Sequence, residues 1–145
     1  MEFINRFIYA ITQLHPTHPM IVHFPIALTG AAFLFILLAY WKKNASLEQA
    51  AFANMVLAAI STVVAGITGV IDNANNYEGE APNASTKIIL ATLLFILTTG
   101  ISIIRYRNPD LFQKINSALY ISSYGLSFAI AITLAFLGGV ILYGF

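Results

Sequence analysis

The three histidines of this chain lie in one short segment, which is therefore the first place to look for chemistry. They are His15, His18 and His23, in the stretch LHPTHPMIVHFPIAL. A neutral imidazole can bind a metal ion, bind the iron of a haem or the magnesium of a chlorin, or relay a proton. The chain contains no cysteine, which excludes disulfides, thiolate metal sites and a cysteine nucleophile.

His23 is the first candidate for binding a cofactor, because a long apolar run follows it and places it in a predicted membrane span. An ionisable side chain in a span is costly and indicates a function. We expect His23 to bind a haem b or a chlorin, or to relay a proton. The alternative is a structural histidine, bonded to a carbonyl or to Asp72, in a protein without a cofactor. His18 is the second candidate for binding a cofactor. Five positions separate His18 from His23, which is about 140° around a helix, so the two side chains would not share a face.

A weaker pattern indicates a metal site outside the membrane. His15 and His18 could bind zinc or copper together with Asp72 or another carboxylate of the same polar loop. The alternative is a stiff, extended linker whose histidines are solvated, because Pro16 and Pro19 bias the residues before them away from helix. The prolines therefore predict that His15 and His18 lie in a stiff linker and that the first spanning helix begins near Pro19.

Composition determines the environment in which these residues act. The chain has 145 residues, of which 59% are hydrophobic and 9% charged, whereas about 25% are charged in an average soluble domain. Lipid must therefore cover much of the surface. A net charge of +1 argues against nucleic-acid binding. The sequence has no phosphate loop, dinucleotide motif or serine–histidine–acid set, so we expect a protein that is not an enzyme.

The apolar runs predict an all-α membrane protein, a bundle of four transmembrane helices preceded by an amphipathic interfacial helix. Residues 1–18 would form that helix and a Pro/His linker, and residues 19–145 the transmembrane domain. The predicted spans are 19–41, 47–71, 84–106 and 111–143, each near the ~20 residues that cross a bilayer. The N-terminal helix, over residues 3–14, would lie in the headgroup plane with one apolar face down or pack on the bundle.

The distribution of charge predicts the orientation of the four spans. Five of the seven basic residues fall at the first and third connections, and three acidic residues fall at the second: Lys42, Lys43, Arg105, Arg107 and Lys114, against Asp72, Glu78 and Glu80. Basic residues favour the cytoplasmic side. We therefore expect a multi-pass protein of the bacterial inner membrane, with both termini and the histidine segment on the periplasmic side.

Three segments carry a resemblance to a known family. The first and most specific reads HPMIVHFPIAL, with His18, Pro19, Val22, His23, Phe24, Pro25, Ala27 and Leu28 at the matching positions. The others are Thr68, Gly69 and Asp72, and then Leu137, Gly138, Gly139 and Tyr143. On these residues the chain, after residue 14, resembles the bacterial membrane family catalogued as domain of unknown function 2231.

The resemblance implies four membrane helices and a periplasm-facing redox setting, because family members are often found beside Rieske and cytochrome modules. Members commonly carry a further histidine at the start of the third helix, where this chain has Ala84-Ser85-Thr86-Lys87. This departure favours a single histidine ligand or a purely structural subunit.

We therefore predict a small non-catalytic subunit of a respiratory or photosynthetic electron-transfer complex. It would contact the lipid bilayer and other redox subunits, and bind haem or chlorin through His23. The alternatives are a stand-alone haem- or metal-binding protein that acts as a homo-oligomer, and a small transporter. The transporter is the weakest, because the later helices carry almost no charge that could line a path.

Overall fold

The computed structural model describes residues 2–9, 17–113 and 117–143, and all regular structure in these ranges is helical. The elements are α1 (Glu2–Tyr9), α2 (Thr17–Ile21), α3 (His23–Lys42), α4 (Ala45–Asn76), α5 (Ala84–Arg107), the 3-10 turn η2 (Leu111–Gln113) and α6 (Ser117–Tyr143).

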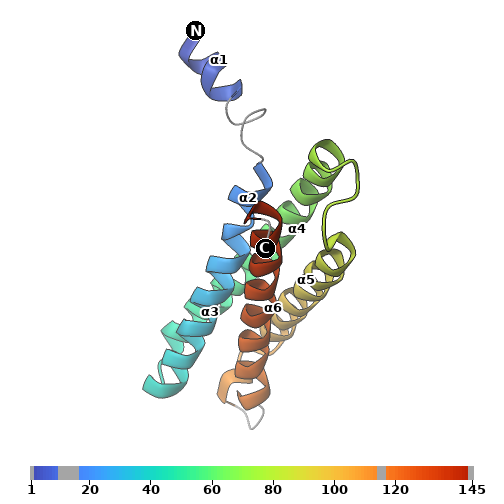
Figure 1. Cartoon of the computed structure of the whole chain (residues 1–145). Coiled ribbons are helices and arrows are strands. Elements are labelled where there is room, and N and C mark those ends of the chain that lie inside the picture. The colour runs from blue at the N-terminus through green and yellow to red at the C-terminus, as the bar shows by residue number, and fades with distance from the viewer. Residues whose placement is uncertain (1, 10–16, 114–116, 144–145) are drawn as a thin grey trace.

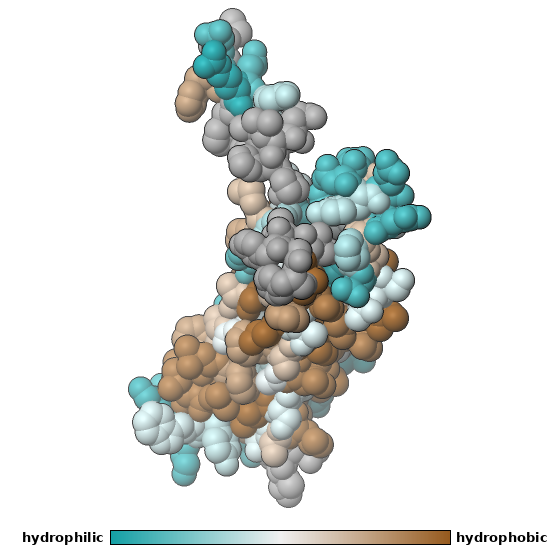
Figure 2. Space-filling model, in the orientation of Figure 1, coloured by the Kyte–Doolittle hydropathy of each residue, from teal (hydrophilic) through white to brown (hydrophobic). Residues whose placement is uncertain are grey.

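Four of the helical segments are long and apolar enough to cross a membrane, as the sequence predicts. They are α2 with α3 (Thr17–Lys42), α4, α5 and most of α6 (Ser117–Val140). Successive segments run in opposite directions and form one bundle (Figure 1). Hydrophobic residues gather around the middle of this bundle and hydrophilic residues toward its ends (Figure 2). This is the pattern of a protein whose solvent is a bilayer.

The two ends of the bundle differ in composition, and we name them by their residues. The histidine end holds the start of α2 and the connection from α4 to α5, residues 77–83. The lysine end holds the connection from α3 to α4 at Lys43 and Asn44, and residues 108–113 before α6. The candidate chemistry of the sequence belongs to the histidine end.

Local sequence explains the sharp turn at the lysine end. Lys43 adopts a left-handed conformation, with φ 49°, and its N–H bonds to the carbonyl of Ala39, which closes α3. The Asn44 side chain then accepts hydrogen bonds from the N–H groups of Ser46 and Leu47, at 2.8 and 3.3 Å. An asparagine at this position satisfies donors that the first turn of a helix otherwise leaves free.

The second span is longer than the sequence predicts, because α4 continues to Asn76 through residues that were expected to form a loop. The Asn76 side chain donates to Asp72, four residues earlier, at 2.6 Å. The turn that follows folds on Asn73, whose side-chain oxygen accepts from the N–H of Ala81 at 2.9 Å. These bonds offset the weak helix propensity of the Asn-rich stretch.

The prediction that His18 lies in an extended linker is wrong. Residues Thr17–Ile21 form the short helix α2, with Pro19 as its third residue. The first turn of a helix tolerates proline, because its N–H groups have no partner within the helix. α2 therefore leads almost directly into α3, with only Val22 between them. Of the predicted helix over residues 3–14, Glu2–Tyr9 is helical as α1, and the remainder lies outside the described residues.

The helices interlock through glycines rather than through large apolar side chains alone. A Cβ on Gly30 of α3 would lie 2.9 Å from the Phe128 ring of α6, and one on Gly125 of α6 would lie 3.0 Å from the Phe33 ring of α3. Each helix thus receives an aromatic ring of the other where it lacks a side chain, a close approach typical of membrane helices. The buried core beside this contact consists of Ala32, Ile36, Ala51, Met55, Ile101, Tyr120 and Tyr124.

Candidate functional site

His18 joins α2 to α4 at the histidine end. Its Nδ1 lies 3.2 Å from the hydroxyl oxygen of Thr68. That hydroxyl lies 3.1 Å from the carbonyl oxygens of both Val64 and Ala65, which can only accept hydrogen bonds. The Thr68 proton is therefore directed to the carbonyls, and its oxygen accepts from the Nδ1–H of His18. With the proton on Nδ1 the ring donates to Thr68, and a backbone hydrogen bond of the imidazole to Ala65 adds to this contact.

A glycine makes the position of the His18 ring possible. A Cβ on Gly69 would lie 2.9 Å from Cε1 of that ring, closer than real side-chain contacts allow. The ring therefore occupies the space of the missing side chain. His18 belongs to the first segment of the family resemblance, and Thr68 and Gly69 belong to the second, so the structure brings the two segments into contact.

Two charged residues complete the surroundings of His18. Asp72 and Lys87 both interact electrostatically with the imidazole, and Asp72 also interacts with Lys87. Asp72 also accepts a hydrogen bond from Asn76, and no hydrogen bond from His23 reaches it in the described structure. Lys87 is the last residue of the region where the resemblance implies a histidine, and it supplies a positive charge there.

His23 occupies a different surface from His18. Its Nδ1 lies 2.6 Å from the carbonyl oxygen of Pro19, one turn earlier, and the side chain is exposed. A carbonyl can only accept, so Nδ1 carries the proton and Nε2 carries the lone pair. Metal-binding histidines usually donate their other N–H to a carbonyl or carboxylate in this way, which fixes the ring for ligation. Among the described residues, Nε2 of His23 has no hydrogen-bond partner.

The structure does not bring the sequence candidates into one site. His18 is directed to α4 and His23 to the exposed face of α3, so they do not form a two-histidine haem site within the chain. His15 lies outside the described residues. In the part of the chain that the structure describes, no group of three histidine or carboxylate side chains could hold a metal ion. The site of His15, His18 and Asp72 therefore stays a prediction.

An apolar groove runs along the bundle beside the residues that flank His23 in the sequence. Its volume is about 470 Å³, and it lies between α2–α3 and α4. Its lining residues are Ile21, Phe24, Leu28, Leu57, Ile60, Ser61 and Val64. A flat apolar ligand or an apolar partner helix could cover this surface, because nearly all of its lining is hydrocarbon.

Sequence reasoning missed a buried ionic cluster at the lysine end. Arg105 of α5 donates to both carboxylate oxygens of Glu48 on α4, from Nε at 2.5 Å and from Nη2 at 2.7 Å. The two side chains are only 12% and 4% exposed. The hydroxyl of Tyr120 on α6 donates to the same carboxylate at 2.9 Å. One carboxylate thus ties three helices together.

The cluster extends one residue further into the bundle. The hydroxyls of Tyr120 and Tyr124 lie 2.8 Å apart, and Tyr124 must donate because the Tyr120 proton is directed to Glu48. The signal was present in the sequence, since Glu48 lies inside the second predicted span and the tyrosines are four positions apart on the fourth. Arg105, near the end of the third predicted span, by itself indicates only a basic residue at a helix end.

The fold and these polar sites define a four-span helical membrane protein with an exposed histidine near one end. The chain belongs to the family described as predicted membrane protein, DUF2231, whose pattern it matches over residues 14–145. Comparison with curated proteins finds no match. Comparison with solved structures finds no match either.

Proposed function

We propose that this chain is a non-catalytic membrane subunit of a periplasm-facing electron-transfer complex, and that His23 binds a haem or a chlorin there. The observation that carries the proposal is the exposed ring of His23, which the Pro19 carbonyl holds through Nδ1 and whose Nε2 has no hydrogen-bond partner among the described residues. An imidazole nitrogen at the membrane boundary is costly to leave unpaired. A ligand from outside the chain would remove that cost.

The residues fit a cofactor with one protein ligand from this chain. His23 would hold the metal of the ring, and the apolar groove that includes Ile21 and Phe24 would cover hydrocarbon beside it. A bound haem would supply a one-electron carrier, and a chlorin would supply light absorption. A second ligand for a haem would come from a partner subunit or from another copy of this chain, because His18 is turned to α4 and His23 lies on the exposed surface.

Charge supports the orientation that this function needs. Lys42, Lys43 and Arg107 are exposed at the lysine end, whereas Glu78 and Glu80 are exposed at the histidine end. The pairing of Arg105 with Glu48 leaves this bias intact. The positive-inside rule then places the lysine end in the cytoplasm and His23 on the periplasmic side of a bacterial inner membrane. An electron carrier at this depth would serve periplasmic redox partners.

The experiment is gentle solubilisation of the tagged protein from its native membrane, followed by its mass, subunit content and absorption spectrum. We expect larger redox subunits and a pigment band, and we expect His23→Ala to abolish the band. His18→Ala is the matched control, because it removes an imidazole that is turned to α4, and it should keep the band. A band of equal intensity in His23→Ala would overturn the assignment of the ligand.

The same experiment distinguishes the proposed subunit from the alternative function, a homo-oligomer that binds haem or metal by itself. In that case the pigment would copurify with copies of this chain alone, and the second ligand would be His23 of another copy. A purified complex whose only polypeptide is this chain would therefore replace the proposed subunit role with the homo-oligomer. A colourless protein that migrates as a monomer would contradict both.

A further inference from the structure

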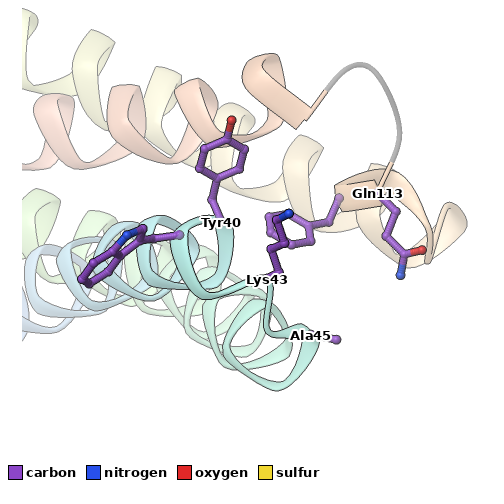
Figure 3. A pocket seen from close by; sticks show the side chains of 6 residues that line it. Tyr40, Lys43, Ala45 and Gln113 are labelled. Carbon is purple, nitrogen blue, oxygen red and sulfur yellow. The ribbon is translucent and has the colours of Figure 1, made fainter.

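A hollow at the lysine end has the chemistry of a binding site that the proposed function does not use. It has a volume of about 600 Å³, within the range of ~300–1,000 Å³ that is typical of ligand sites. The last turn of α3, the start of α4 and η2 all contribute to it: Tyr40, Trp41, Lys43, Ala45, Phe112 and Gln113. Lys43 lies between Tyr40 and Gln113 in the view of Figure 3.

The position of two aromatic residues places this hollow at the membrane surface. Tyr40 and Trp41 end an apolar span and are 61% and 78% exposed. Tyrosine and tryptophan at the end of a span lie at the level of the lipid headgroups. Both side chains have a hydrogen-bond donor, as has the amide of Gln113. Side chains that carry hydrogen-bond donors thus line the hollow at the depth where phosphate groups of lipids lie.

The exposed charge at this end of the bundle is mainly positive, with Asp110 as the exposed acidic residue among the described residues there. Lys43 lines it, and Lys42 and Arg107 are exposed at the same end of the bundle. Glu48 does not oppose them, because Arg105 neutralises it in the buried cluster. Basic pockets beside membrane helices complement anionic lipid headgroups. The chemistry that fits the hollow is therefore a negatively charged phosphate ester with apolar chains below it.

Lys43 has a backbone conformation that usually favours glycine. Its φ of 49° is left-handed, the conformation in which helices usually end with glycine, because glycine has no Cβ to strain. A lysine here is unfavourable for the backbone, yet its side chain lines the hollow. The position therefore also offers a variant, Lys43→Gly, that removes the charge while favouring the observed turn.

We propose that this hollow binds the headgroup of an anionic phospholipid. Lys43 is the cationic contact, and Tyr40, Trp41 and Gln113 donate hydrogen bonds to the phosphate and its ester oxygens. The acyl chains then lie along the exposed apolar end of α3. The bound lipid bridges α3 and η2.

The chain contains a single tryptophan, and it lines the hollow, so fluorescence of Trp41 reports directly on the site. The purified protein is reconstituted in phosphatidylcholine vesicles with increasing amounts of brominated phosphatidylglycerol or brominated phosphatidylcholine. We expect phosphatidylglycerol to quench Trp41 with an apparent affinity about fivefold higher, the ratio that one lysine contact of about 1 kcal/mol gives. Inorganic phosphate added to the vesicles is the control for a site that recognises the free anion.

Two charge variants decide whether the preference comes from this hollow. Lys43→Gly is expected to abolish the preference and to raise the melting temperature slightly, so that loss of binding cannot be attributed to misfolding. Lys42→Gln removes the neighbouring charge, which does not line the hollow, and should keep the preference. Equal losses in the two variants, or an unchanged preference in Lys43→Gly, would overturn the proposal. Displacement of phosphatidylglycerol by inorganic phosphate would assign the site to the free anion instead.

Discussion

The buried pair of Glu48 and Arg105 makes the most quantitative prediction for the stability of the bundle. Replacement of Arg105 by methionine keeps a long side chain but removes both hydrogen bonds to a carboxylate that is 4% exposed. Breaking one partner of a buried pair costs about 3–5 kcal/mol, because the other charge stays buried without compensation. The contact of the Arg105 guanidinium with the Phe52 ring, at 5.5 Å, is lost as well and adds ~0.5–1 kcal/mol.

The double variant separates the buried charge from the packing. Glu48→Met with Arg105→Met removes both charges together, and such replacements of a buried pair are often neutral, so we expect a free energy of unfolding within about 1 kcal/mol of the native protein. Glu48→Met alone leaves the Arg105 charge buried and should cost a similar ~3–5 kcal/mol, so the coupling energy of the double-mutant cycle is about 5–10 kcal/mol. Lys42→Met, at an exposed lysine of the same end, is the control and should change stability by less than ~0.5 kcal/mol.

Reversible unfolding in mixed micelles, followed by the helical circular dichroism signal, measures these free energies. Additive single variants, with a coupling energy below ~0.5 kcal/mol, would refute the reasoning, because they would mean that water reaches the carboxylate.

Variants of the two tyrosines check which hydroxyl donates in the hydrogen-bonded cluster. Tyr120→Phe leaves the fully buried hydroxyl of Tyr124 without its acceptor and should cost ~1–3 kcal/mol. Tyr124→Phe leaves the bond of Tyr120 to Glu48 in place and should cost about 0.6 kcal/mol.

Three further predictions follow from single positions. Gly30→Ala should destabilise the bundle by about 1–3 kcal/mol, because the new methyl group meets an aromatic ring of α6. Gly66→Ala is the control: its methyl group meets nothing within 4 Å, and it should stabilise the bundle by ~0.5–1 kcal/mol. Equal effects of the two variants in thermal unfolding would contradict the contact at Gly30. Gly69→Ala should displace the histidine ring of α2 and speed proteolysis at α2, and unchanged cleavage would count against that contact. Because the chain has no cysteine, Glu80→Cys should react with a membrane-impermeant maleimide in intact cells and Asp110→Cys only after lysis; the reverse pattern would invert the orientation.

The sequence was sufficient to predict the number of spans, because that prediction depends on the length and hydropathy of long segments. The sequence was less informative where weak helix propensity is opposed by side-chain hydrogen bonds and packing. The stretch from Asp72 to Asn76 has poor helix formers, but side-chain hydrogen bonds and continuity with α4 keep it helical. His18 is helical despite two nearby prolines, because its contact with Thr68 and the gap at Gly69 hold α2 on α4.

The candidate site was also predictable only in part from the sequence. The sequence pointed to His18 and His23 by residue type, and their spacing predicted that they would not share a face. It did not predict that His18 meets Thr68 and Gly69, because that contact depends on the packing of α2 against α4. The cluster of Glu48 and Arg105 was missed because the two residues are 57 positions apart, and each by itself resembles an ordinary charge at the end of a span.

The proposed role of His23 is to bind a haem or chlorin at the outer surface of the bundle. A dithionite-reduced minus oxidised difference spectrum of the gently solubilised protein tests this role, with pigment extraction from the same sample and from His23→Ala. We expect a haem or chlorin in a fixed ratio to this chain, and its loss in the variant. A wild-type complex that contains neither pigment would contradict the claim and leave His23 with the single hydrogen bond that it makes to Pro19.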